Sequence, residues 1–334
     1  MKKKYQNAFF VFGLVLLVVM ITQLDFVQVW EGLRHAGYWF IAVLALWFFL
    51  YFFNTTSWYI IIRSTAAHQG EGDKIPFMWL YKVMVSGFAL NYATPGGLMG
   101  GEPYRIMELS PHIGAERASS SVILHTMTHI FSHLWFWLLS VVIYIASETV
   151  TPFMAGLLAA VTAFCAIGIW FFMKGYRKGL ANRAMALLSR IPGAKRRARR
   201  FIETHHDQLD NIDRQIAALH RQNPRTFWGA LLLELACRFA SALEVMFVLL
   251  VIMPSVSYLQ CVLILAFTSL FANLLFFMPL QIGGREGGFM MSASGLALTS
   301  SAGIFVALIV RLRELFWTAM GMLLIKVGKR AKTR

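Results

Sequence analysis

Two stretches decide the fold of this sequence, Pro95-Gly-Gly-Leu-Met-Gly-Gly-Glu102 and Pro279-Leu-Gln-Ile-Gly-Gly-Arg-Glu286. In each of them a glycine lies five residues after the proline and a glutamate lies seven residues after it. Both stretches interrupt apolar runs that would otherwise form continuous membrane helices. Because helices broken at corresponding places in two halves commonly form the binding site of a membrane protein, the pair predicts a duplicated fold with its site at the breaks.

The composition is that of a membrane protein. Of the 334 residues, 58% are hydrophobic and 14% are charged, and the mean hydropathy is +0.61, outside the range of soluble domains. The formal net charge is +15, but the basic residues gather in loops beside apolar runs, chiefly at 2–4, 174–200 and 326–334. This distribution is the positive-inside pattern, and we expect no nucleic-acid partner.

The sequence predicts an all-α polytopic membrane protein that forms a single domain over residues 1–334. Six runs are long enough to cross about 30 Å of hydrocarbon, at about 8–24, 37–62, 118–147, 151–173, 227–252 and 303–325. Two further regions, at about 76–116 and 258–300, are apolar but broken at the two motifs. We therefore expect about six full transmembrane helices plus two broken or re-entrant helical hairpins.

The basic clusters predict the sides of the membrane. They place both termini and the basic 174–226 loop in the cytoplasm. Counting crossings from there, the first hairpin enters from the cytoplasm and the second from the outer side. Residues of about 37–147 and about 227–325 then form an inverted repeat whose breaks meet near the midplane. The alternative is that each hairpin is two complete helices joined by a kink or a loop.

The 174–226 loop carries apolar residues at helical spacing between its basic residues. This pattern predicts amphipathic helices that lie on the inner leaflet. The alternative is an ordinary solvated linker of basic charge.

Glu102 and Glu286 are the first candidate site residues, because a charge at the bilayer centre costs on the order of 3 kcal/mol. The glycines before them permit sharp turns. The acids are candidates for a gate or for a proton-coupled group, and the alternative is that each is a first-turn acid that stabilises its own helix. The candidate substrate-binding and gating residues are Pro95, Gly96, Gly97, Gly100, Gly101, Glu102, Arg105, Gly283, Gly284, Arg285, Glu286 and Arg311.

Charged residues near mid-span predict paired networks that face a cavity. Arg311, and with it Arg105, is a candidate to bind a phosphate, because arginine binds phosphate bidentately and stays charged when buried. Glu234 and Arg238 are four residues apart and share one helix face. For all of these residues the alternative is structural ion pairing between helices.

Three histidines, His125, His129 and His133, repeat every four residues along the run 118–147. A line of histidines can relay protons or contact a headgroup, and the alternative is interior packing. No Cys or acid lies at ligand spacing and the H-E-x-x-H pattern is absent, so we expect no metal and no cofactor.

The two motifs resemble the signatures of a known family. Asn91-Tyr-Ala-Thr-Pro-Gly-Gly-Leu-Met-Gly-Gly-Glu-Pro-Tyr-Arg105 is similar to the first signature of the lysylphosphatidylglycerol synthase transmembrane-region family, also called the flippase-like domain family. Met278-Pro-Leu-Gln-Ile-Gly-Gly-Arg-Glu286, followed by Arg311, is similar to the second. It departs from the usual Pro-Gly-Gly-x-Gly-x-x-Glu, because Leu280-Gln-Ile precedes Gly283.

The resemblance implies a multi-pass protein of the bacterial inner (cytoplasmic) membrane. In the best-known members this region moves aminoacylated phosphatidylglycerol between leaflets, and a separate C-terminal soluble domain attaches the amino acid. The sequence ends at Arg334, shortly after the last apolar run. We therefore expect a stand-alone flippase-like protein without a synthase domain.

Three functions fit these observations. The first is a flippase that moves an anionic or modified phospholipid, or a polyprenyl-phosphate-type lipid, between leaflets. The second is an enzyme that modifies a lipid headgroup, with Glu102 or Glu286 as general base. The third is a non-catalytic membrane partner of a lipid-modifying enzyme. No nucleophile elbow or nucleotide-binding loop is present, so we expect a translocase and not an enzyme, with membrane lipids as its partners.

Overall fold

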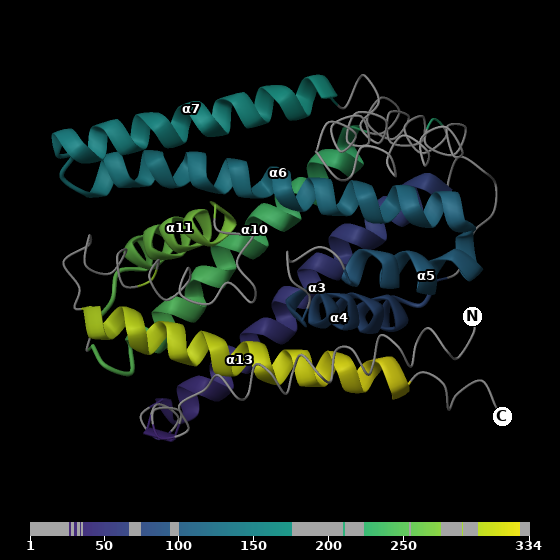
Figure 1. Cartoon of the computed structure of the whole chain (residues 1–334), viewed down its shortest axis with the longest axis horizontal. Helices are drawn as coiled ribbons and strands as arrows, with labels where there is room; N and C mark the ends of the chain where they lie inside the picture. The colour runs from purple at the N-terminus through teal and green to yellow at the C-terminus, as the bar shows by residue number, and fades with distance from the viewer. Residues whose placement is uncertain are drawn as a thin grey trace, which may run out of the picture.

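The computed structural model describes residues 36–66, 75–93, 100–175, 224–253, 255–274 and 300–327, with a few single residues besides. These residues form eight α-helices and no strand, which confirms the expected all-helical class (Figure 1). The helices are α3 (Tyr38–Ala66), α4 (Phe77–Ala93), α5 (Gly101–Ile113), α6 (Ala115–Ser147), α7 (Pro152–Gly175), α10 (Pro224–Leu249), α11 (Tyr258–Leu274) and α13 (Ser300–Val327).

Five of the six expected crossings coincide with helices α3, α6, α7, α10 and α13 within a few residues. The sixth, at 8–24, lies outside the described residues. Of the described helices, three are both long and apolar enough to cross a membrane, over Tyr38–Ser64, Ala115–Ser147 and Pro152–Trp170. Helices α10 and α13 carry charged residues near their middle, and their 26 and 28 residues would span about 39 and 42 Å at the rise of an α-helix. The count of six full crossings stays a prediction.

The first broken region is interrupted at its motif. Helix α4 ends at Ala93 and α5 begins at Gly101. Helix α5 then ends at Ile113 and is capped by Gly114, whose φ of +82° lies in the left-handed region that favours glycine. The backbone N–H of Gly114 donates to the carbonyl of Ser110 at 2.9 Å, and α6 begins at the next residue. This turn explains why α6 starts at Ala115 and not at the expected residue 118.

The second broken region is described only in its first half, which is α11. The motif that follows it lies outside the described residues, and so does nearly all of the basic 174–226 loop. The expected geometry of the second break and the expected docking of the loop therefore stay predictions.

Helices from the two halves of the chain pack against one another. The most extensive contacts join α3 to α10 and α4 to α13, and α6 packs on α7, α10 and α11. In Figure 1 the α5–α6 turn and the end of α13 lie at one end of the molecule, whereas the α6–α7 turn and the start of α13 lie at the other. Helices α6 and α13 thus run in opposite directions.

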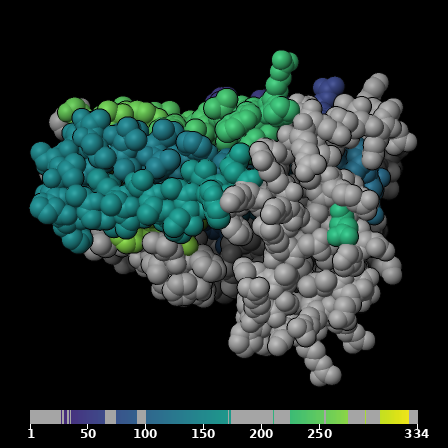
Figure 2. All heavy atoms as spheres, turned by 90° about the horizontal axis from the view of Figure 1, so that it is seen from above, coloured from purple at the N-terminus to yellow at the C-terminus, as the bar shows by residue number. Residues whose placement is uncertain are grey.

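The described face formed by α6 and α7 exposes large apolar side chains. Helices α6 and α7 form one continuous face of the molecule, coloured teal in Figure 2. On α7 the outward side chains include Phe153, Ile167 and Trp170, which are 80%, 66% and 57% exposed. Apolar exposure on this scale marks contact with lipid or with another protein, and it suits a helix that crosses a membrane.

Candidate functional site

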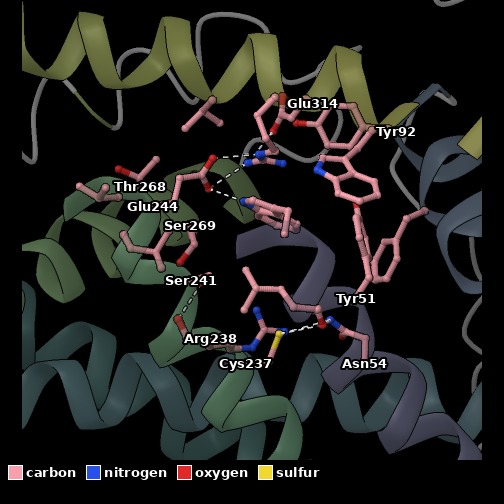
Figure 3. A pocket seen from close by; sticks show the side chains of 18 of the residues that line it. Tyr51, Asn54, Tyr92, Cys237, Arg238, Ser241, Glu244, Thr268, Ser269 and Glu314 are labelled. Carbon is pink, nitrogen blue, oxygen red and sulfur yellow. Dashed lines mark hydrogen bonds and ion pairs between the residues drawn. The ribbon is translucent and has the colours of Figure 1, made fainter. Parts of the chain in front are cut away.

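A cavity of about 260 Å³ lies among six helices, α3, α4 and α6 from the first half of the chain and α10, α11 and α13 from the second (Figure 3). It contains charged side chains although most of its wall is apolar and aromatic. The histidine, acidic and basic residues in its wall are His129, His133, Glu234, Arg238, Glu244, Arg313 and Glu314. Two clusters of these residues, on opposite stretches of α10, give the cavity its polar character.

The first cluster joins Glu244 of α10, Arg313 of α13 and Trp47 of α3. Arg313 donates from Nε to Oε1 of Glu244 at 2.8 Å and from Nη2 to Oε2 at 3.1 Å. The indole N–H of Trp47 donates to the same Oε2 at 2.9 Å. The guanidinium also lies 3.8 Å from the Trp47 ring centroid, over its face. This is a bidentate, buried pair with a cation–π contact, and it joins the two halves of the chain.

The second cluster lies ten residues earlier on α10, about 15 Å along the helix. Glu234 is 1% exposed and reaches two histidines of α6. Its Oε2 lies 2.8 Å from Nδ1 of His129, and its Oε1 lies 3.2 Å from Nε2 of His125. Two of the three expected histidines therefore contact one buried carboxylate, and the third, His133, lines the cavity beside His129. Among the described residues, no group of His, Cys, Asp and Glu side chains has the geometry to hold a metal ion.

Arg238 shares the face of Glu234 but does not pair with it directly. Its Nε donates to the hydroxyl of Ser132 at 2.7 Å, and its Nη2 donates to the carbonyl of His129 at 2.8 Å. Both acceptors are neutral oxygens of α6. Within the described part of the chain, no carboxylate forms an ion pair with this guanidinium, which lines the cavity. Arg238 therefore presents a positive charge that its hydrogen-bond partners do not neutralise.

The first motif forms its own arrangement at the start of α5, outside the wall of the cavity. Asn91 of α4 donates from Nδ2 to Oε1 of Glu102 at 2.9 Å and accepts the N–H of Gly101 at Oδ1 at 2.7 Å. Glu102 lies in the first turn of α5, where a carboxylate is stabilised by the helix dipole. The role of Glu102 as a gate or proton-coupled acid stays a prediction.

Arg105 lies one turn further along α5 and is 2% exposed. Its guanidinium carbon lies 4.8 Å from the ring centroid of Phe88 and 5.8 Å from that of Trp58. No described residue accepts a hydrogen bond from its Nε or Nη2. It interacts electrostatically with Glu102 and Glu234, and it does not line the cavity.

The contact between α4 and α5 depends on glycine. A Cβ at Gly101 would collide with the carbonyl oxygen of Gly87 and would lie 2.6 Å from Oδ1 of Asn91. We expect Gly101→Ala to lower the free energy of unfolding by about 1–3 kcal/mol, because the Gly87 carbonyl is part of the α4 backbone and cannot retreat without moving that helix. Thermal unfolding of the purified protein in detergent measures the effect.

The matched control is Gly156→Ala in α7, where a Cβ would meet nothing within 4 Å. Alanine has the higher helix propensity, so this variant should be unchanged or more stable by up to about 1 kcal/mol. If both variants unfold at the same temperature as the unchanged protein, the contact at Gly101 is not tight.

Arg311 lies on α13 two residues before Arg313, and it does not line the cavity. Its Nη1 lies 3.8 Å from Oε2 of Glu314. Of the other expected site residues, Gly100 precedes α5, while Pro95, Gly96, Gly97, Gly283, Gly284, Arg285 and Glu286 lie outside the described residues. The candidate substrate-binding and gating residues did not include Trp47, Glu234, Arg238, Glu244 and Arg313, which supply the polar wall of the cavity together with the histidines. The sequence predicted Glu234 and Arg238 only as mid-span charges on one helix face.

A family model described as the lysylphosphatidylglycerol synthase TM region matches residues 8–321, nearly the whole chain. The match confirms the resemblance seen in the two motifs. No curated protein and no solved structure matches the chain significantly.

Proposed function

The chain belongs to the lysylphosphatidylglycerol synthase transmembrane-region family, and from this membership and the cavity we propose that it moves a phosphate-bearing lipid between the leaflets of a membrane. The family is a membrane domain associated with lipid modification and flipping. From the family we infer a multi-pass protein of the bacterial inner membrane, and from the distribution of its basic residues we infer that both termini lie in the cytoplasm.

The observation that carries the proposal is Arg238 in the wall of the cavity. Its charge lies among six helices and forms no direct ion pair with a described carboxylate. A ligand that brings a negative charge to it would stabilise such a buried cation. A lipid phosphate is such a ligand, because a guanidinium and a phosphate form charge-assisted, often bidentate hydrogen bonds. A cavity of about 260 Å³ is near the lower limit of small-ligand sites. It suits a headgroup whose acyl chains stay in the bilayer.

The packing of the helices supports an inverted repeat. In such a repeat α3 would correspond to α10, α4 to α11 and α6 to α13. A two-fold axis that exchanges the halves then relates the α4–α13 contact to the α6–α11 contact, and it relates the α3–α10 contact to itself. All three contacts occur, and α6 and α13 run in opposite directions (Figure 1). Such a repeat lets a protein open its central site alternately to either side.

Reconstituted protein tests the proposal. The purified chain is placed in vesicles of phosphatidylethanolamine and phosphatidylglycerol that contain a trace of fluorescent phosphatidylglycerol. A membrane-impermeant reductant then quenches the label in the outer leaflet. We expect the protein to bring the protected label to the outer leaflet far faster than occurs in protein-free vesicles or in vesicles with heat-inactivated protein.

Equal rates in all three kinds of vesicle would contradict the proposal for this lipid class. Mass spectrometry of the recovered lipid distinguishes a translocase from an enzyme that modifies the headgroup. An unchanged headgroup is expected of a translocase, and a converted headgroup would establish an enzyme.

A further inference from the structure

We propose that Glu234, His125 and His129 form a proton-binding site, and that one proton moves with each lipid phosphate that passes through the cavity. This inference rests on the proposed lipid movement and adds its driving force. The proton is then a second ligand of the cavity, beside the lipid phosphate.

The geometry is that of an exchangeable proton site. One carboxylate faces two imidazoles, at 2.8 Å on the His129 side and at 3.2 Å on the His125 side. One buried carboxylate thus contacts two imidazoles, and all three groups can take up a proton. Histidine is the side chain that changes charge most readily between pH 5 and 8, and a carboxylate beside it stabilises the imidazolium.

The cluster is connected to the cavity. The His129 side chain is 32% exposed and lines the cavity, whereas His125 is 2% exposed and packs 6.1 Å from the Trp58 ring. The His133 ring lies 5.4 Å from that of His129 and also lines the cavity. The three histidines cover about 12 Å along α6. A proton that enters the cavity can therefore reach Glu234 through His133 and His129.

Charge balance ties the proton to the lipid. Three arginines, at positions 238, 311 and 313, and three glutamates, at 234, 244 and 314, line the described cavity or pair with its wall. With neutral histidines their charges sum to zero. A lipid phosphate brings one negative charge into this low-dielectric site, and a proton on the histidine cluster cancels it. The cavity is therefore neutral when it is empty and when it holds both a phosphate and a proton. These two states are favoured over a cavity that holds only one of the ligands.

Charged and titratable groups on three elements face the cluster. Arg238 and Cys237 of α10 and Arg105 of α5 interact electrostatically with Glu234, and His133 lies beside His129 on α6. Helices α3 and α4 contribute the non-titrating rings of Trp58 and Phe88. The two arginines oppose the protonated cluster, and a phosphate bound at Arg238 removes part of that opposition. Lipid binding thus favours proton binding, and the converse follows by linkage.

The test uses the full chain in vesicles of phosphatidylethanolamine and phosphatidylglycerol with fluorescent phosphatidylglycerol as the probe. A pH difference of one unit is imposed, and the membrane potential is clamped at zero with potassium and valinomycin. At one proton per lipid, the label should accumulate about tenfold in the leaflet that faces the less acidic side. An equal distribution between the leaflets, with rapid movement of label, would overturn the coupling and leave the lipid movement intact.

Two variants and a control sharpen the result. Glu234→Gln imitates the charge of the proton-loaded site, so it should still move lipid but lose the tenfold accumulation. His129→Gln, which removes the imidazole nearest the carboxylate, should lose the accumulation as well. His112→Gln, an exposed histidine of α5 that packs beside Trp79, should keep it. A Glu234→Gln protein that still accumulates label would contradict the assignment.

A second measurement does not depend on transport. Infrared pH-difference spectra of the purified, ¹⁵N-histidine-labelled protein should contain a histidine signal that Glu234→Gln shifts and His112→Gln leaves in place. If lipid movement fails altogether, this signal still decides whether the cluster binds a proton. Its absence between pH 5 and 8 would overturn the proton site.

Discussion

Replacing Glu244 by alanine is expected to lower the free energy of unfolding by about 3–5 kcal/mol, because it leaves the buried Arg313 guanidinium without its carboxylate. The pair is bidentate and both side chains are almost fully buried. Trp47 would also lose the acceptor of its indole N–H. Glu314 lies 3.8 Å from Arg313 Nη2, too far to replace the lost bonds. The midpoint of thermal unfolding in detergent should fall by roughly 10 °C.

Two further variants distinguish the effect of an unpaired buried charge from a non-specific loss of stability. Glu148→Ala, at the end of α6, removes an acid that pairs with no arginine of this cluster and should shift the midpoint by little. The double variant Glu244→Leu with Arg313→Met should recover most of the lost stability, since an apolar pair often replaces a buried ion pair without net cost. A double variant as unstable as Glu244→Ala would show that packing, and not the unpaired charge, dominates.

Local signals in the sequence predicted the class of the fold and the place of the first break. Apolar runs longer than about 20 residues indicate helices that cross a membrane, and clustered glycines mark where such a helix stops. Helix α4 accordingly ends at Ala93 and α5 begins at Gly101. The family was predicted from the same residues, because the first of its motifs lies at this break.

The wall of the cavity could be predicted only in part, because it depends on which face of each helix points inward. Helix α13 is apolar on nearly every face, so its sequence carries no clear stripe that marks the interior. Arg311 and Arg313 lie two residues apart, which places them about 200° apart around the helix. Only Arg313 reaches the cavity and Glu244, a partner 69 residues earlier in the chain.

The histidine line of α6 was a better guide. Its i, i+4 spacing fixes one face, so its three members had to share a direction whatever the packing. The spacing could not predict which side chain the histidines contact. Glu234 and Arg238 are also four apart, and this spacing predicted only that the two share one helix face. In the structure Glu234 instead contacts His125 and His129, while Arg238 donates to Ser132 and the His129 carbonyl.

Replacing Arg238 by glutamine is expected to slow the movement of fluorescent phosphatidylglycerol by roughly ten- to a hundredfold, because a charge-assisted contact to phosphate contributes about 1.5–3 kcal/mol. Arg238→Lys should also be impaired, since an ammonium carries its donors on a single atom and cannot reproduce the planar fork that reaches Ser132, the His129 carbonyl and a phosphate. Glutamine can still donate to an α6 oxygen, so the unfolding midpoint should change less than in Glu244→Ala. The vesicle assay with the impermeant reductant measures the rates.

Arg311→Gln is the matched comparison, because it removes the same charge from a position on α13 that pairs with Glu314 and lies outside the cavity wall. The motif resemblance favours Arg311 as the headgroup residue, whereas the cavity favours Arg238. If Arg238 holds the phosphate, its substitution must slow transport more than that of Arg311 at equal amounts of folded protein. If Arg311→Gln slowed transport more than Arg238→Gln, Arg311 would be the residue that binds the phosphate. The hydrogen bonds from Arg238 to α6 would then be a structural link between the two halves of the chain.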